Sequence, residues 1–425
     1  MQRFHIKMTL ERQWRWLLLG CLSVSYLLVF MQRTGPGVIS NSIQGEFHVS
    51  AAVLGSITSI QYLLYMVMQI PIGVYGDKSG PEPMLVLGVL LDGVGTLVFS
   101  SVHTFGWLLV GRAIVGLGDS FIWINIVLIL AKWFGKGRFA AVLGIVNTAG
   151  NTGAIITSIP LAAWIAVAGW HIPFIILGLL LVAVSVVDFF VVMRPFAGRE
   201  TLTEPDSTLV IHKVPLARML SEVVRDRLAW STFFCHFGAM GTYLSMVSLW
   251  VVPYFMAVYQ LSRGHAAWFT LIGFVGSLIA SPVVGWLSDR LQNRKGPYLV
   301  TQSLGFLAWL TVVLCGGRPP VALAGVVMFV VGFGSGSSLL TFAVIRDLVS
   351  PQRSGVTSGF ANTGGFLSAV LLPILFGAVF DGFGGAAGGT EIVRHAYGMA
   401  FVLPTLFSSL GIMGSLLLPT KSASR

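Results

Sequence analysis

Residues 73–78 read Gly-Val-Tyr-Gly-Asp-Lys, and residues 285–290 read Gly-Trp-Leu-Ser-Asp-Arg, which is the same pattern 212 residues later. A second pair of matches has nearly the same offset. The stretch Gly-Ile-Val-Asn-Thr-Ala-Gly at 144–150 returns 215 residues later as Gly-Phe-Ala-Asn-Thr-Gly-Gly at 359–365. Two independent matches at nearly one offset indicate that the chain holds two copies of one structural unit, as many secondary transporters do.

The composition around these repeats is that of a membrane protein. Apolar residues make up 55% of the chain and charged residues 10%, and the mean hydropathy is +0.84; a soluble domain carries about 25% charged residues. The apolar residues form runs of about 20, the length that crosses ~30 Å of hydrocarbon as a helix. Because lipid offers the backbone no hydrogen-bond partner, these runs are expected to be helices. They are continuous rather than alternating, which excludes a β-barrel.

The sequence therefore predicts an all-α membrane protein with twelve spans, arranged as two pseudo-symmetric six-helix bundles. The N-terminal bundle is expected at residues 1–193, a cytoplasmic linker at 194–227 and the C-terminal bundle at 228–425. The spans are expected at 14–36, 51–76, 83–101, 106–131, 139–165, 171–193, 228–258, 266–288, 297–315, 320–343, 355–380 and 396–418.

Lysine and arginine are distributed unevenly among the loops. With a cytoplasmic N-terminus, three of the 26 (Arg263, Arg318 and Arg394) lie outside, two (Arg33 and Arg112) lie within spans, and the remaining 21 are cytoplasmic. This positive-inside pattern predicts a multi-pass protein of the inner (plasma) membrane with both termini in the cytoplasm. The net charge of +10 then follows from topology, and nucleic-acid binding is not expected.

No cofactor, metal site or enzymatic activity is expected. The cysteines, Cys21, Cys235 and Cys315, lie inside apolar runs without partners at metal or redox spacing, and we interpret them as small buried hydrophobic residues. No nucleophile–base constellation emerges. The basic N-terminus resembles a signal peptide but lacks a small-residue cleavage site, which predicts an uncleaved first span. The partners expected are the lipid bilayer, a small-molecule substrate and protons, with the chain monomeric.

The Gly-x-x-x-Asp-basic element resembles the loop motif of the major facilitator superfamily (MFS), and the resemblance covers the whole chain through span number, linker and both copies. In that family the Asp pairs with neighbouring helix ends and latches the cytoplasmic side. The resemblance assigns this gating role to two sets of residues, Gly73, Asp77 and Lys78, and Gly285, Asp289 and Arg290. The first copy departs from the family pattern after Gly80, where Pro-Glu-Pro stands in place of basic residues.

The fourth span carries Arg112-x-x-x-Gly116-x-Gly118-Asp119, which places positions 112, 116 and 119 on one helix face. The arrangement resembles that of the anion:cation symporter branch, in which the carboxylate binds the proton and the Arg assists coupling. Burial disfavours an ionised Asp119, whereas a nearby Arg favours it, so such a group can gain and lose a proton. A permanent Arg112–Asp119 structural pair is the alternative. Asp92 in the third span is a second candidate proton site or a partner for an Arg.

Arg33 lies in the first span and is the most informative single residue. A guanidinium stays protonated and presents a planar fork that suits a carboxylate or phosphate, and an unpaired Arg in a bilayer is costly. Anion:cation symporters and organophosphate antiporters place an Arg at a similar position, which implies a site for a substrate anion. Neutralisation of Arg33 by Asp119 or Asp92 is the alternative.

Departures from the related branches narrow the expected substrate. The seventh span lacks the second Arg of organophosphate antiporters, and Gln69 stands where nitrate porters have an Arg. Gln32 precedes Arg33, where many anion:cation symporters have Asp. A singly charged organic anion, moved together with protons, fits this pattern best.

Further polar residues of the spans are candidates for the substrate site, with helix packing as the competing explanation. They are Gln61, Tyr65 and Gln69 at a four-residue spacing, Asn147 and Asn362 at equivalent places in the repeat, and Trp250, with His236 as a weaker candidate. Asp188 and Asp381 lie near helix ends and are expected to be structural.

The function predicted is secondary active transport of a small organic anion by alternating access, coupled to proton symport. Two alternatives remain open: a transporter-like solute sensor, which needs a cytoplasmic output surface, and an antiporter or exporter of a zwitterionic or neutral solute.

Overall fold

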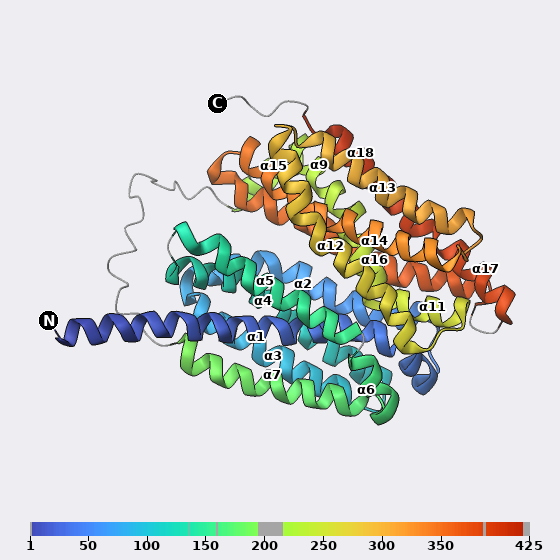
Figure 1. The fold of residues 1–425 in the computed structure, drawn as a ribbon, viewed down its shortest axis with the longest axis horizontal. Helices are drawn as coiled ribbons and strands as arrows, with labels where there is room; N and C mark the ends of the chain where they lie inside the picture. Colours follow the sequence, from blue (N-terminus) through green and yellow to red (C-terminus); the bar gives the residue numbers. More distant parts are fainter. Residues whose placement is uncertain (1, 135, 159, 194–215, 386–387, 420–425) are drawn as a thin grey trace. The chain divides into compact units, whose positions relative to one another are not determined.

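The computed structural model describes residues 2–134, 136–158, 160–193, 216–385 and 388–419. Within these ranges it does not describe the side chains of residues 2–12, 69–79, 136–141, 158, 216–220 and 351–352. Every regular element in the described part of the chain is a helix, and none is a strand (Figure 1). Twelve of the described helices are long and apolar enough to cross a membrane, which confirms the all-α class and the predicted number of spans.

The first six spans precede residue 194. They comprise α1 (Gln2–Phe47), α2 (Ala51–Ser79), α3 (Pro81–Ser101), α4 (Phe105–Trp133), α5 (Lys136–Ser158) with α6 (Pro160–Ala168), and α7 (His171–Val192).

The last six spans follow a short helix, α8 (Leu216–Arg225). The seventh span is subdivided into α9 (Arg227–His236), η1 (Phe237–Gly241), α10 (Thr242–Ser245), η2 (Met246–Trp250) and α11 (Val251–Tyr259). The others are α12 (Arg263–Arg290), α13 (Lys295–Leu314), α14 (Val321–Gly336) with η3 (Ser337–Leu339) and α15 (Leu340–Leu348), α16 (Pro351–Gly382), and α17 (Thr390–Ala400) with α18 (Val402–Leu417).

The first helix is longer than its apolar pattern predicts. We expected the span to end at residue 36, but α1 continues through Pro36 to Phe47. A proline removes one N–H and crowds only the turn before it, so a helix can resume beyond it when its neighbours favour that path. Ser40 Oγ donates to Gly37 O at 3.1 Å in the resumed helix. The polar residues after Pro36 therefore belong to the helix and not to a loop.

The seventh span is unusually irregular and unusually buried. Its two π-helical turns, η1 and η2, lie within nine residues of each other. The most apolar part of this span is 83% buried, against 38–61% for the other spans. Short π segments within α-helices occur frequently at functional sites. The sequence contained no signal for them.

The described contacts divide the chain into two compact units. The first comprises Met1–Arg33, Val67–Ile156 and Ala168–His212; the second comprises Thr34–Met66, Thr157–Val167 and Lys213–Arg425. The division does not follow the repeat, because residues 34–66 group with the C-terminal half. The bundle boundaries predicted at 193 and 228 remain a prediction.

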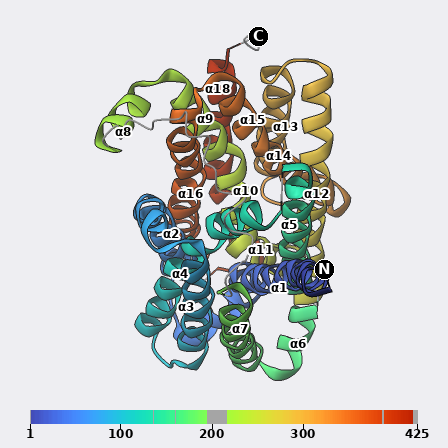
Figure 2. The same cartoon turned by 90° about the vertical axis from the view of Figure 1, so that its left-hand side faces the viewer.

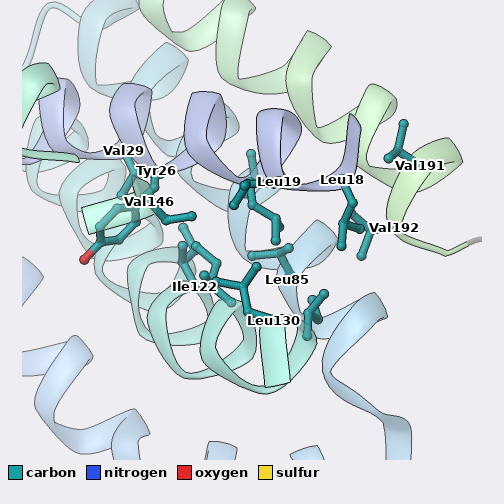
Figure 3. Packing of buried hydrophobic residues seen from close by; sticks show 14 of the residues in the cluster. Leu18, Leu19, Tyr26, Val29, Leu85, Ile122, Leu130, Val146, Val191 and Val192 are labelled. Atoms are coloured by element: carbon teal, nitrogen blue, oxygen red, sulfur yellow. The ribbon is translucent and has the colours of Figure 1, made fainter. Parts of the chain in front are cut away.

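The core of the first unit is formed by apolar side chains of α1, α3, α4, α5 and α7. Leu18 and Leu19 of α1 point toward Leu85 of α3 and Leu130 of α4 (Figure 3). Helices α3 and α4 run side by side (Figure 2). They approach closely because a methyl group at Gly111 of α4 would lie 2.6 Å from a backbone atom of α3. This packing fixes α4, which carries the candidate proton site, against α3.

Candidate functional site

Arg33 and Asp119 form a buried ion pair between α1 and α4. Arg33 Nη2 lies 2.9 Å from Asp119 Oδ1, and Arg33 Nε lies 3.3 Å from Asp119 Oδ2. The two residues are 8% and 1% exposed. This two-point contact is the fork geometry in which a guanidinium binds a carboxylate. The sequence left open whether Arg33 is available to a substrate anion or is neutralised by a carboxylate of the protein. In this structure Asp119 neutralises it.

Two more buried charged residues flank this pair. Asp92 of α3 and Arg112 of α4 are both 0% exposed. Asp92 interacts electrostatically with Asp119, Arg33 and Arg112, and the Arg112 guanidinium carbon lies 5.4 Å from the centroid of the Phe99 ring. The structure thus brings together the four charged residues that the sequence analysis proposed for substrate binding and proton coupling. We call Arg33, Asp92, Arg112 and Asp119 the charge cluster.

Gly118 explains how α3 and α4 come close enough to form this cluster. A methyl group there would lie 2.6 Å from Asp92 Oδ1, 2.6 Å from Gly88 O and 2.8 Å from Asp92 N. Two of those atoms belong to the α3 backbone, which cannot move without separating the helices. Gly118 is therefore required for the close packing that positions Asp92 beside Asp119.

We expect Gly118→Ala to lower the melting temperature and to reduce the transport predicted from the sequence more than tenfold. Overpacking a tight contact costs about 1–3 kcal/mol, and here the strain falls on the backbone beside the charge cluster. Uptake into proteoliposomes and thermal unfolding of the purified protein measure the two effects. Gly106→Ala in the same helix is the matched control, since a methyl there meets nothing within 4 Å. Wild-type stability and uptake in Gly118→Ala would contradict this role of the glycine.

The polar stripe predicted on α2 comprises Gln61, Tyr65 and Gln69. Gln61 and Tyr65 lie in the second unit, which includes α2 as far as Met66. Gln61 is fully buried, and the Tyr65 ring centroid lies 4.2 Å from that of Phe366 in α16. Tyr62, which no sequence pattern indicated, is 1% exposed and its hydroxyl lies 2.7 Å from Ser248 Oγ. The side chain of Gln69 lies outside the described residues. Tyr65 thus packs against α16, and its neighbour Tyr62 contacts both α16 and the seventh span.

The repeated Asn-containing motif packs helices in both halves. In α5, a methyl at Gly150 would lie 2.7 Å from the Tyr26 ring of α1. In α16, a methyl at Gly365 would lie 2.8 Å from Met240 Sδ of the seventh span. Asn147 is exposed and Asn362 is partly exposed. The glycines thus account for close packing, and both amides remain candidates for contact with a solute.

Trp250 and His236 are both buried in the seventh span and both are hydrogen-bonded. Trp250 Nε1 donates to Pro373 O at 3.2 Å, and its ring lies 5.1 Å from that of Phe376. His236 Nδ1 lies 2.9 Å from Thr341 Oγ1. A role for Trp250 in substrate binding therefore requires its indole to become exposed in another state of the protein.

The second copy of the gating motif links two helix ends. Asp289 at the end of α12 pairs with Arg294, whose Nε donates to Asp347 Oδ2 of α15 at 2.9 Å. The Arg290 guanidinium carbon lies 5.3 Å from the Trp286 ring centroid, and Gly285 leaves open space at its Cα. Ion pairing of Asp289 with a neighbouring helix end is what the family resemblance implies. In the first copy, Gly73, Asp77 and Lys78 lie in α2, but their side chains are outside the described residues.

Two polar contacts near helix ends could not be found from sequence patterns. Ser25 Oγ of α1 lies 2.6 Å from Asp188 Oδ2 of α7, and both residues are fully buried. Asp381 of α16 binds the first residues of α2. The sequence marked both aspartates as near helix ends, but their partners are 163 and 330 residues away. Only the packing of distant segments reveals such pairs.

The comparison with protein families agrees with this architecture. The family model described as Major Facilitator Superfamily matches residues 22–373 and 244–425. The chain belongs to the Major Facilitator Superfamily. It is therefore a member of a transporter family, and the resemblance carried by the loop motifs is confirmed.

Individual members of the MFS show what kind of transporter the chain is similar to. It is 25% identical over 398 residues to the D-galactonate transporter of Escherichia coli, covering 87% of this chain and 90% of that one. It is 26% identical over 425 residues to the hexuronate transporter of Bacillus subtilis, covering 92% and 95%. Among solved structures, a bacterial homologue of the human lysosomal transporter Spinster superposes with a TM-score of 0.78 at 18% identity, covering 95% and 98%; this likeness concerns the fold.

Proposed function

We propose that this MFS protein transports a small organic monoanion, such as a sugar acid, by proton-coupled symport with alternating access. The charge cluster carries the proposal. In our proposal the N-terminus, the C-terminus and the 194–227 linker lie in the cytoplasm and the chain is a monomer in the inner membrane. The names of the two relatives support the substrate class, since galactonate and hexuronate are both sugar carboxylates.

The charges of the cluster indicate how anion and proton are linked. With both arginines protonated and both aspartates ionised, the formal charge is zero, and the Arg33 fork is occupied by Asp119. A substrate carboxylate competes with Asp119 for the same fork. Protonation of Asp119 removes that competition and leaves one unbalanced positive charge, which one anion neutralises. An unbalanced charge in such a buried place is costly, so proton and anion stabilise each other's binding.

In the proposed cycle, a proton from outside binds Asp119 and releases Arg33 to bind the substrate carboxylate. The protein then opens to the cytoplasm, where Asp119 loses its proton and takes the guanidinium back from the substrate. The Arg33–Asp119 pair described here is the substrate-free, deprotonated arrangement of this cycle. Arg112 and Asp92 keep the remaining charge in balance, and the buried Asp92 is a second group able to carry a proton.

Uptake into proteoliposomes tests the function directly. We expect an inward proton gradient to drive accumulation of radiolabelled galactonate or a hexuronate, and a protonophore to abolish it, while galactose is not taken up. One monoanion and one proton together carry no net charge. A response of uptake to an imposed membrane potential therefore reports that more than one proton accompanies each anion. Uptake of the neutral sugar, or anion uptake that ignores the proton gradient, would contradict the proposal.

A further inference from the structure

The carboxylate of Asp381 holds the beginning of a helix that lies 330 residues away in sequence. Asp381 Oδ1 accepts a hydrogen bond from Ala51 N at 3.1 Å, and Oδ2 accepts one from Ala52 N at 2.9 Å. These are the first two residues of α2. The first N–H groups of a helix have no partner within it, and negative charge near them is stabilised by the helix dipole. Asp381 thus acts as an N-terminal cap supplied by another span.

A continuous seam leads along the two helices to this carboxylate. Along α2, Ala51, Gly55 and Ser59 follow one another at four-residue spacing and share a face. A methyl at Gly55 would lie 2.5 Å from Pro373 O, and Ser59 Oγ donates to Val370 O at 2.6 Å.

The facing stripe of α16 has the same spacing, through Pro373, Gly377 and Asp381. A methyl at Gly377 would collide with the Ala51 carbonyl. Gly55 and Gly377 therefore allow backbone-to-backbone contact over two turns, at the end of which the Asp381 carboxylate binds the N-terminus of α2.

Other contacts join the same two parts of the sequence. Tyr62 OH and Ser248 Oγ lie 2.7 Å apart, and Arg263 Nη2 donates to Ser42 Oγ at 2.7 Å. A methyl at Gly37 would lie 2.8 Å from Val247 O. Residues 34–66, which belong to the first six spans, are thus held to the seventh, eighth and eleventh spans within the second unit.

The number of spans places this contact on one side of the membrane. One span precedes Ala51, and the eleventh span ends at Gly382. The start of α2 and the end of α16 therefore face the same side, opposite to both termini. The gating motif with Asp289 follows eight spans and faces the side of the termini. Asp381 is therefore an aspartate at a helix end on the side opposite to the gating motif.

We propose that Asp381 is a positioning residue that keeps this face of the transporter closed by capping α2 from α16. The role of this contact in a transport cycle rests on the proposed function. The closing of the face by Asp381 does not depend on it. Opening this face to receive substrate requires the carboxylate to leave both amides. The contact stabilises the closed state of this face, and its loss shifts the protein toward the state open on the side opposite to the termini.

Thiol labelling tests the proposal without substrate or proton gradient. Ala369→Cys provides a reporter, since Ala369 is 0% exposed and packs with Tyr62, Tyr65 and Phe366 beneath the seam. The exposed Cys315 is replaced by serine, and the protein with both Ala369→Cys and Cys315→Ser is the parent. Labelling by a membrane-impermeant thiol reagent is measured in cells, and the background of Cys315→Ser alone is subtracted. We expect Asp381→Asn to raise the labelling rate about tenfold, the size of effect of one charged hydrogen bond.

Two further variants distinguish the loss of the Asp381 contact from a general loss of structure. Asp381→Glu keeps the charge and is expected to label within about threefold of the parent. Ala51→Pro removes one donor at the first helical position, where proline is tolerated, and is expected to label as fast as Asp381→Asn. Glu391→Gln, on the same side and paired with Arg394 of the same helix, is the matched control and is expected to leave labelling unchanged.

The result that overturns the proposal is parent-like labelling in both Asp381→Asn and Ala51→Pro. If Asp381→Asn does not fold, Ala51→Pro decides alone, with a monodisperse elution profile as the criterion of folding. A failure of proton-driven uptake in the wild-type protein contradicts the proposed function but leaves this labelling result intact, so the two proposals can fail separately.

Discussion

Uptake of a sugar carboxylate is expected to fall at least a hundredfold when Arg33 is replaced by alanine. The substitution removes the group that binds the anion and leaves Asp119 buried without its cation. Removing one partner of a buried ion pair costs about 3–5 kcal/mol, which corresponds to roughly two to four powers of ten in an equilibrium constant. Initial uptake rates in proteoliposomes, at protein levels matched by quantitative blotting, measure the effect.

Two further variants make the Arg33 experiment specific. Arg33→Lys retains the charge but not the two-point fork, and we expect it to recover only a small part of the activity. Arg318→Ala removes an exposed arginine in the loop after the ninth span and is expected to transport normally. A ligand that binds only the folded protein raises its melting temperature, so galactonate should stabilise the wild type but not Arg33→Ala. Equal stabilisation of both proteins would show that the anion binds elsewhere.

Asp119→Asn is expected to separate accumulation from exchange. Asparagine resembles the protonated aspartate, so Arg33 is permanently released and can bind substrate on either side. Proton-driven accumulation is lost because position 119 no longer binds or releases a proton. Exchange of internal for external substrate needs no net proton movement, and we expect it to stay within about tenfold of wild type. Counterflow and gradient-driven uptake in the same proteoliposome preparation measure the two activities.

The matched variant is Asp119→Glu, which keeps a titratable carboxyl on a longer side chain. It is expected to retain proton-driven accumulation at a reduced rate. Accumulation by Asp119→Asn under a proton gradient would show that another group, with Asp92 as the first candidate, couples the proton. Loss of both accumulation and exchange, together with a lower melting temperature, would instead indicate that the Arg33–Asp119 pair is structural.

Several features of this protein follow from its sequence alone, because they depend on local composition and spacing. A run of apolar residues must become a helix in lipid whatever lies beside it, so the number of spans was predictable. The two Gly-x-x-x-Asp copies are local patterns and identified the family. An arginine or aspartate within a span is costly unless it serves a purpose, and this argument, together with the family resemblance, selected the four members of the charge cluster.

The pairing within the charge cluster depended on the tertiary structure. Arg112 and Asp119 share a face of one helix, and spacing alone made them natural partners. The structure shows Asp119 in the fork of Arg33, which comes from another helix. Helix spacing states which residues share a face, but the neighbouring helix decides which charge lies opposite.

The same limit applies to the contact that closes one face. Asp381 stood in the sequence only as an aspartate near a helix end, and the apolar pattern of its span contains no sign of its partners. Its partners are backbone amides, which every residue except proline carries, so no pattern of side chains can mark them. Local chemistry determined the spans, the family and the charged residues of this protein. Only the packing of segments up to 330 residues apart decided which of those charges meet and where the chain is held closed.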